Sequence, residues 1–178
     1  MEHGLPDISA LDLSAAGLQA SRLDAERRDE LFGLMEACSA FFELVEGHHP
    51  ALADADALID DRPDGFPSER KLLIGLRSAN RLIGVLEVLQ DYPDDTTWYL
   101  GLLLLDPAFR GQALGAAVYA AACRWAAIYC ARRMQLVVQA QNPAALRFWQ
   151  AMGFREIGRA VQHVGAMENQ VLRMAHDF

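Results

Sequence analysis

Residues 102–115 read LLLLDPAFRGQALG and join an apolar run to a turn that contains Gly111 and Gly115. The apolar run predicts a buried strand, and a helix is predicted to begin inside the turn. The first N–H groups of a helix lack backbone partners, and the positive end of the helix dipole lies at the same place. Arg110 adds a permanent charge and a planar set of donors. The stretch therefore predicts a strand, an anion-binding turn and a helix, and a ligand that carries a pyrophosphate.

A long helix with one buried face is predicted to follow the turn. Its apolar residues recur at spacings of three and four, at Leu114, Val118, Ala121, Trp125 and Ile128. Arg132 and Arg133 are predicted to close this helix, because cations suit the negative end of the helix dipole. Residues 134–138, MQLVV, then predict a strand. Strand, helix and strand in this order predict a parallel pair joined by a right-handed crossover.

A second helix is predicted over residues 142–149, which read NPAALRFW. Asn142 is predicted to cap it, and Pro143 suits its first position. Residues 152–154, MGF, follow as its exit.

Two ordered motifs in this half resemble those of the GNAT acetyltransferases. Arg110-x-x-Ala113-x-Gly115 resembles the family's Arg/Gln-x-x-Gly-x-Gly/Ala signature, and the NPAALRFW helix resembles its Asn-x-x-Ala-x-x-Phe-Tyr helix. The resemblance covers roughly residues 70–178. It implies a GNAT fold, acetyl-CoA as the co-substrate and transfer of an acetyl group to a primary amine by direct attack in a ternary complex.

The resemblance also implies which residues contact the donor. We expect acetyl-CoA to bind at Leu103, Leu104, Leu105, Arg110, Gly111, Gln112, Ala113, Leu114, Gly115, Asn142, Phe148 and Trp149. Ala113 stands where the signature has glycine, so a positive φ there would strain it. Asn142 has two compatible roles, a helix cap and a hydrogen bond to the cofactor.

Trp149 is the largest departure from the family pattern. It stands where many members carry a tyrosine that protonates the departing CoA thiolate, and an indole N–H is no acid at ordinary pH. Either the thiolate leaves unaided or another group assists it. We expect Trp149 to pack in the core or to form a wall against the pantetheine arm.

Glu87 is the first candidate for a general base. It is the only charge in residues 82–89, LIGVLEVL, so it lies either on an exposed edge or in a buried place where it has a purpose. A symmetric hairpin would bring it opposite Leu100 or Gly101. A glycine within a strand fits a bulge, and the resemblance implies that residues 101–103 offer a backbone N–H to the thioester carbonyl. Partial burial would raise the pKa of the glutamate toward neutrality.

Tyr99 is the second catalytic candidate, and Asp91 and His163 are further ones. A single histidine in the strand predicted over residues 160–164 is more often structural than catalytic.

The whole chain is predicted to form one domain, residues 1–178, of the α/β (α+β-like) class. We expect a mixed, mostly antiparallel sheet of about six to seven strands with a parallel unit at the cofactor site, flanked by about four helices. The first half is predicted to hold helices over residues 24–45 and 51–59 and strands over residues 71–76, 82–90 and 97–105.

Charge is distributed unevenly along the chain. The net charge is −8, but residues 1–100 carry eight Lys or Arg against twenty Asp or Glu, whereas residues 101–178 carry eight Arg against four. The acidic half would form the acceptor side, so we expect a cationic acceptor, an amine of a small molecule or a peptide. Acidity that only keeps the protein soluble is the alternative. A nucleic-acid partner is disfavoured because no basic stripe is present.

No metal, membrane or disulfide chemistry is expected. Residues 54–61 hold four aspartates but lack the glycine and terminal glutamate of a calcium loop. Residues 1–7 have no apolar core, and no apolar run is long enough to span a bilayer, so we expect a cytoplasmic protein. Cys38, Cys123 and Cys130 are expected to be free thiols.

Two other functions stay open at this stage. One is a CoA-binding regulatory or interaction domain that has lost catalysis, and the other is a phosphate-binding turn that serves a nucleotide. The oligomeric state is open, and a homodimer is allowed for.

Overall fold

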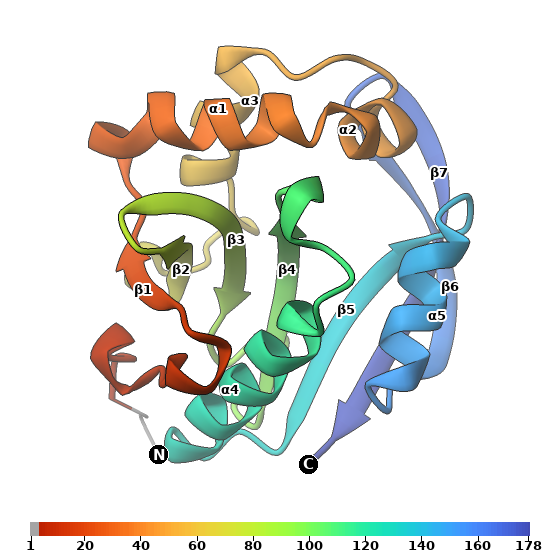
Figure 1. Cartoon of the computed structure of the whole chain (residues 1–178). Helices are drawn as coiled ribbons and strands as arrows, with labels where there is room; N and C mark the ends of the chain where they lie inside the picture. Colours follow the sequence, from red (N-terminus) through yellow and green to blue (C-terminus); the bar gives the residue numbers. More distant parts are fainter. Residues whose placement is uncertain (1–3) are drawn as a thin grey trace.

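The computed structural model describes residues 4–178, so the first three residues of the N-terminal segment discussed above lie outside it. Residues 4–178 form seven strands and five α-helices (Figure 1). In chain order these are β1 (Gln19–Arg22), α1 (Arg28–Ala37), α2 (Ser39–Glu46), α3 (Leu52–Asp60), β2 (Lys71–Ser78), β3 (Arg81–Leu89), β4 (Thr97–Leu105), α4 (Leu114–Ile128), β5 (Arg133–Gln139), α5 (Pro143–Ala151), β6 (Arg155–Val164) and β7 (Met167–Asp177).

All seven strands belong to one sheet with the order β1-β2-β3-β4-β5-β7-β6. β4 and β5 run parallel with α4 as their crossover, and the other neighbours are antiparallel. The predicted mixed sheet with a parallel unit is therefore confirmed. β4 and β5 pair only where residues 97–99 face residues 133–135, and beyond that point the two strands separate (Figure 1). The sheet is thus open at its centre.

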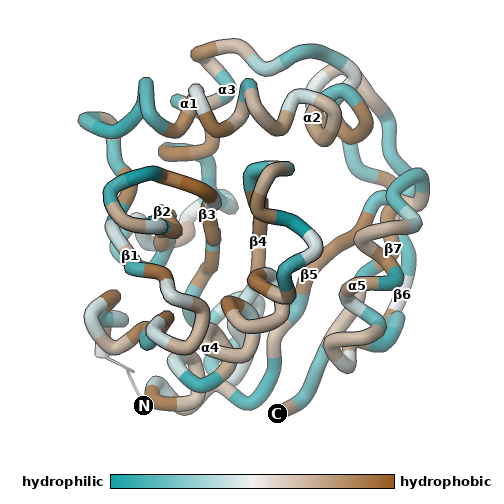
Figure 2. Tube along the Cα trace, viewed as in Figure 1, coloured by the Kyte–Doolittle hydropathy of each residue, from teal (hydrophilic) through white to brown (hydrophobic). Residues whose placement is uncertain are grey.

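Helices cover both faces of the sheet. Val118, Ala122 and Trp125 of α4 pack against Trp98 and Leu100 of β4 in one hydrophobic cluster. A second cluster joins α1, α2 and α3 to β2 and β3, through residues that include Leu31, Met35, Phe42, Ala55, Leu73 and Val85. β3 and β4 are hydrophobic along most of their length (Figure 2), whereas β5 alternates between buried and half-buried residues.

A β-bulge interrupts β4 at Gly101. Glu87 pairs with Leu102 and Val88 pairs with Leu100, so Gly101 is the extra residue. The bulge predicted at this glycine is confirmed. The predicted register was wrong, because the extra residue moves the partner of Glu87 on to Leu102.

The long helix predicted over residues 24–45 is wrong. α1 ends at Ala37 and α2 begins at Ser39, with Cys38 between them in a non-helical conformation. The Cys38 thiol donates to the carbonyl of Leu105 at 3.4 Å, so contact with the end of β4 accompanies the break. After the bend, α2 lies beside the hairpin of β6 and β7 (Figure 1), where the N–H of Ala166 donates to the carbonyl of Glu46.

The end of α4 and the presence of β1 also differ from the prediction. α4 stops at Ile128, and Cys130 has a φ of 65°, so the helix is over before Arg132 and Arg133. Arg133 instead begins β5, and its Nε contacts Asp177 at 2.5 Å. β1 was not predicted, because its four residues, QASR, include no β-branched or aromatic side chain.

The cysteines agree with expectation. Cys38, Cys123 and Cys130 are free. In the described part of the chain, no helix has the length and apolar composition needed to cross a bilayer.

Candidate active site

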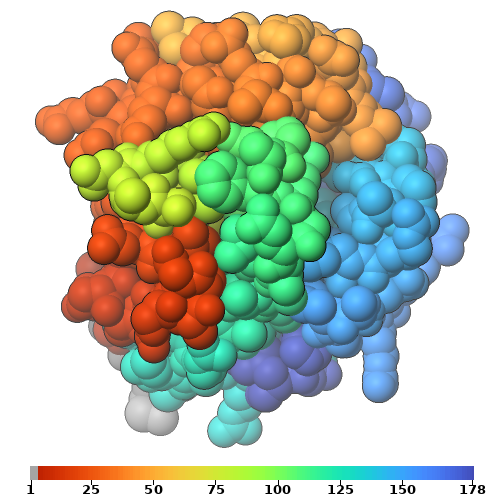
Figure 3. Space-filling view, in the orientation of Figure 1, coloured from red at the N-terminus to blue at the C-terminus, as the bar shows by residue number. Residues whose placement is uncertain are grey.

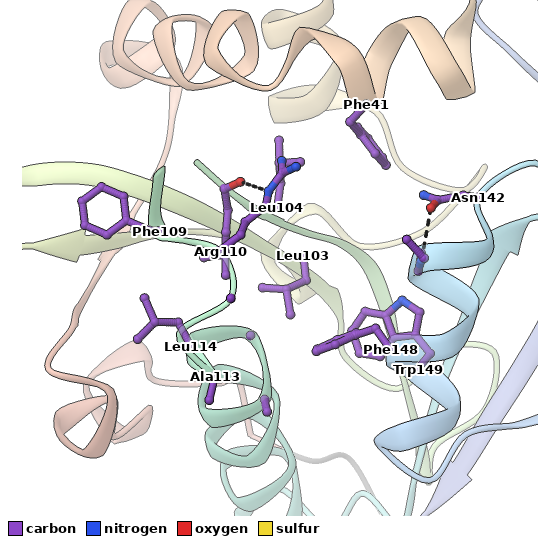
Figure 4. A pocket seen from close by; sticks show the side chains of 16 residues that line it. Phe41, Leu103, Leu104, Phe109, Arg110, Ala113, Leu114, Asn142, Phe148 and Trp149 are labelled. Atoms are coloured by element: carbon purple, nitrogen blue, oxygen red, sulfur yellow. Dashed lines mark hydrogen bonds between the residues drawn. The ribbon is translucent and has the colours of Figure 1, made fainter. Parts of the chain in front are cut away.

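A cavity of about 490 Å³ lies where β4, the following turn, α4 and α5 meet (Figure 4). Eleven of the twelve residues expected to contact the donor line it, and the exception is Gln112, which is exposed and lies 3.4 Å from the carbonyl oxygen of Ala108. In the space-filling view a furrow separates the segment after β4, in green, from α5, in light blue (Figure 3). The remaining wall residues, which the sequence did not indicate, are Phe41, Phe109, Ala116, Ala144 and Ala145.

The turn before α4 presents free backbone donors to this cavity. Among residues 4–178, the N–H groups of residues 111–116 have no hydrogen-bond partner. Gly111 has a φ of 74° and Ala113 a φ of 58°, so the alanine occupies the left-handed conformation that glycine tolerates best. A Cβ at Gly115 would lie 3.2 Å from the ring of Phe148, which leaves little room there for a side chain. Six donors at a helix N-terminus suit a pyrophosphate.

Arg110 is anchored at the same turn. Its Nε donates to the carbonyl of Leu105 at 2.8 Å (Figure 4), and its Nη2 lies 3.6 Å from the sulfur of Cys38. Burial raises the pKa of the Cys38 thiol, which is therefore neutral at pH 7. The guanidinium is thus held at the cavity wall as a fixed positive charge.

α5 forms the opposite wall. Trp149 is only 7% exposed, and its ring packs edge-on against Phe148 and Tyr119 with centroids 4.8 and 5.5 Å away. The residue both packs in the core and lines the cavity, where Figure 4 shows it facing Phe41 from across the space. The Oδ1 of Asn142 accepts the N–H of Ala145 at 3.1 Å, which confirms the predicted cap.

A second cavity, of about 520 Å³, lies on the face covered by α1, α2 and α3. Glu87, Tyr99 and Gly101 contribute to it from the sheet, and the hairpin of β6 and β7 contributes residues 162–165. A smaller space of about 110 Å³ lies between the two cavities, at the point where β4 and β5 separate. It shares wall residues with each cavity, so both cavities adjoin the opening in the sheet.

Glu87 lies directly against the bulge. A Cβ added to Gly101 would fall 2.5 Å from its Oε2, so the carboxylate occupies the space that a side chain would take. Its Oε1 lies 3.2 Å from the Nζ of Lys71, and the Glu87 side chain is 15% exposed. Burial raises the pKa of this carboxyl group above its ordinary value, although the Lys71 ammonium opposes the shift. A buried carboxylate with a raised pKa at a cavity wall is a candidate for a general base.

Tyr99 lies beside Glu87 in the second cavity. Its ring contacts that of Tyr92 edge-on, with centroids 5.8 Å apart. Burial raises the pKa of Tyr99 to about 12, and the neighbouring Tyr92 and Glu87 add to the shift. The hydroxyl is therefore protonated at neutral pH and can donate a hydrogen bond.

The other two candidates have partners of their own. Asp91 forms an ion pair with Arg70 near the start of β2. His163 is 78% exposed and lies 3.4 Å from Glu168 across the hairpin, although it also borders the second cavity. Each contact gives the residue a structural role that does not require it to take part in catalysis.

One side-chain cluster within residues 4–178 has the spacing of a metal site. Atoms of Glu46, His48 and Asp54 lie within 4.8 Å of one another beside the second cavity. Burial and the neighbouring Asp54 raise the pKa of Glu46. Of the aspartate-rich segment 54–61, only Asp54 belongs to this cluster. The two carboxylates of the cluster would attract a cation, whether a metal ion or an ammonium group.

The sequence matches a family model over residues 31–154, well over half of the chain, and the model describes the acetyltransferase (GNAT) family. The chain belongs to this family. This GNAT acetyltransferase is therefore an acyltransferase, and acetyl-CoA is the donor that its family uses. No curated protein sequence matches it.

Solved structures share the fold of this GNAT acetyltransferase at low identity. An acetyltransferase from Thermus thermophilus is 24% identical with a TM-score of 0.71, over 90% of this chain and 97% of that one. The spermidine N-acetyltransferase of Vibrio cholerae, in complex with CoA and spermine, is 16% identical with a TM-score of 0.68, over 90% and 95% of the two chains. The ribosomal-protein-S18-alanine N-acetyltransferase of Escherichia coli is 14% identical with a TM-score of 0.64, over 90% and 93%.

Proposed function

We propose that this GNAT acetyltransferase transfers the acetyl group of acetyl-CoA to a primary amine of a cationic small molecule or peptide, by direct attack in a ternary complex. One observation carries the proposal. Two cavities each share wall residues with the smaller space where β4 and β5 separate, and Glu87 lines the second cavity against Gly101, which borders that space. A donor entering from one face and an acceptor entering from the other would meet beside a general base.

The first cavity suits the donor. In the proposal the pyrophosphate accepts from the N–H groups of residues 111–116, and the pantetheine arm runs along residues 103–105 beside Trp149. Within residues 4–178, β4 pairs with β5 only up to Tyr99, so in the proposal backbone groups of residues 101–103 on that side bind the arm and the thioester carbonyl.

The chemical step uses few protein groups. The neutral amine attacks the thioester carbonyl carbon and forms the C–N bond, and the nitrogen passes its proton to the Glu87 carboxylate. The C–S bond then breaks, and CoA leaves as the thiolate. Because a thiol has a pKa of about 8.5, the thiolate can leave without an acid, and Trp149 in place of the family's tyrosine is tolerable. Tyr99 is proposed to orient the reactants through its hydroxyl.

The second cavity suits a cationic acceptor. Glu46, Asp54 and Asp61 line it together with Glu87, and the one nearby ammonium, that of Lys71, is buried against Glu87. Such a cavity attracts positive charge and disfavours anions. A structural neighbour that holds spermine, itself a cationic amine, is consistent with this preference.

Turnover with a panel of amines tests the proposal. We expect acetyl-CoA to raise the melting temperature by roughly 5–10 °C at one hundred times its dissociation constant, and ATP to leave it unchanged. Mono-, di- and polyamines and a short peptide would be supplied as acceptors. Acetylated product should be measured by mass spectrometry, because the exposed Cys130 would react with thiol reagents. Tight binding of acetyl-CoA without product from any amine would contradict the activity.

Glu87→Gln is the matched variant for this experiment. Loss of a general base costs about 100-fold to 10,000-fold in rate, so we expect kcat/KM for the amine to fall within that range. The melting shift with acetyl-CoA should stay the same, because the residue lies on the acceptor face. An unchanged pH profile would show that another group takes the proton.

A further inference from the structure

Lys71 is the only lysine of the chain, which otherwise uses fifteen arginines. It begins β2, is 5% exposed, and lines the second cavity, which we call the acceptor cavity because the acceptor is proposed to bind there. Its ammonium donates to the carbonyl of Leu58 at 2.8 Å and to the carbonyl of Asp61, and it lies 3.2 Å from the Oε1 of Glu87. Every proton of the ammonium therefore has an acceptor.

The geometry explains why this position holds lysine. An ammonium places three donors around one point, which suits two carbonyl oxygens and one carboxylate oxygen converging from different directions. A planar guanidinium is larger and would offer its donors in a fork instead. The two carbonyls lie at the C-terminal end of α3, where helix carbonyls lack partners and the dipole is negative.

The contacts link two parts of the acceptor cavity. α3 and the residues after it form one wall, and Glu87 faces the bulge on the floor. We propose that Lys71 is a positioning residue: it holds the Glu87 carboxylate against Gly101 and fixes the end of α3 as the wall of the acceptor cavity. The inference rests on the proposed role of Glu87 as the base.

The electrostatics around Glu87 give the expected direction of a pH effect. Burial raises the pKa of Glu87, the Lys71 ammonium lowers it, and Asp61 raises it. Tyr99 of β4 faces the same carboxylate, and the cavities that contain Glu87 are also lined by Tyr92, Arg173, Glu46, Asp54 and His163. Removing the ammonium leaves burial and Asp61 unopposed, so the base would be protonated up to a higher pH.

Lys71→Met tests the inference by activity. A base works only when deprotonated, so the acid limb of kcat/KM for the amine should move to higher pH by about one unit or more. The KM for the amine should rise, because the end of α3 loses its anchor, whereas the KM for acetyl-CoA should change less than twofold. Lys71→Arg keeps the charge but not the shape, so it should restore the acid limb without restoring kcat. An unmoved acid limb together with an unchanged amine KM would overturn the inference.

Two outcomes separate this inference from the proposed function. If Glu87→Gln retains full turnover, the proposed base is wrong. If Glu87→Gln abolishes turnover while Lys71→Met leaves both the pH profile and the amine KM unchanged, the base stands and the positioning role is wrong.

Stability gives a test that does not depend on turnover. A buried charge without its partner is strongly destabilising, so Lys71→Met should unfold more easily than the double variant Lys71→Met/Glu87→Gln. When the pKa of a carboxyl group is higher in the folded protein than in the unfolded chain, the protein loses stability as the pH rises through the folded pKa. The free energy of unfolding of Lys71→Met should therefore lie far below that of the double variant at high pH and close to it at low pH. Equal stability of the single and double variants at high pH would contradict the contact.

The wild-type protein offers a further measurement if Lys71→Met fails to fold. With one lysine, a sample labelled with ¹³C-lysine gives one side-chain Cε signal in NMR. We expect this signal to shift as Glu87 titrates and expect the step to vanish in Glu87→Gln. A signal that is the same in both proteins at every pH would overturn the inference.

Discussion

Ala113 occupies a backbone conformation that is costly for alanine, at the turn where the donor is proposed to bind. Its φ of 58° and ψ of 8° lie in the left-handed region, and its carbonyl accepts the N–H of Ala117 at 3.0 Å as the helix begins. A left-handed conformation costs a residue with a Cβ about 1–2 kcal/mol. The strain is held at a candidate binding site, where the direction of the backbone N–H groups matters most.

Ala113→Gly should therefore stabilise the protein. The relief of about 1–2 kcal/mol is partly offset by about 0.4–1 kcal/mol of extra chain entropy in the unfolded state, which leaves a net gain of roughly 0.5–1 kcal/mol. Thermal or urea unfolding measures the change. Ala120→Gly is the matched control, because Ala120 is exposed in the middle of α4 and glycine there should cost about 1 kcal/mol. Equal losses from both substitutions would mean that residue 113 has an ordinary helical backbone in solution.

At the scale of the element, the bulge in β4 lies where the acceptor and the donor are proposed to meet. Gly101 is the extra residue, and after it Leu102 and Leu104 face the cluster under α1 to α3 while Leu103 and Leu105 face α4. The same glycine leaves room for the carboxylate of Glu87. One small residue thus accounts for both the change of face in β4 and the position of the proposed base.

Gly101→Ala is expected to displace Glu87. The new Cβ would lie 2.5 Å from Oε2 and 2.9 Å from Cδ, and Lys71 limits the retreat of the carboxylate. We expect a loss of stability of about 1–3 kcal/mol from overpacking and a fall in kcat of about tenfold or more, with the affinity for acetyl-CoA unchanged. Gly158→Ala in β6 is the control, because nothing lies within 4 Å of a Cβ there. Full activity of Gly101→Ala in steady-state assays would contradict the placement of Glu87 as base.

The sequence predicted elements that depend on local pattern and missed features set by distant contacts. β4 was predicted with the bounds that it has, and the cap at Asn142 was predicted from its own neighbours. The break at Cys38 was missed because apolar spacing continues across it, and Phe41 was therefore not assigned to the donor cavity. Lys71 gave no signal either, because its carbonyl partners, at the end of α3, are brought to it only by the folding of the chain.

At the scale of the whole molecule, the uneven charge along the sequence gives the two cavities different charges. Residues 1–100 carry the excess of acid and supply Glu46, Asp54 and Asp61 to the acceptor cavity, whereas Arg110 in the basic remainder lies at the donor cavity. Opposite charges therefore lie where an anionic donor and a cationic acceptor are proposed to bind. The same field would keep the two reactants from occupying each other's cavity.

Asp54→Asn tests whether the negative charge of the acceptor cavity attracts the acceptor, and it should not disturb the fold. The Oδ2 of Asp54 accepts the N–H of Ala51 at 2.7 Å, and asparagine keeps an oxygen for that bond while it removes the charge. We expect the KM for a diamine to rise about threefold to fivefold, which is the effect of roughly 1 kcal/mol, and the KM for acetyl-CoA to stay constant. Asp56→Asn on the same helix is the control, because Asp56 pairs with Arg28 and lies outside the cavity wall. Added salt should raise the diamine KM of the wild-type protein and narrow the gap to Asp54→Asn, because screening weakens the attraction that only the wild type retains in full. A diamine KM that is indifferent to both the substitution and the salt would mean that shape, and not charge, selects the acceptor.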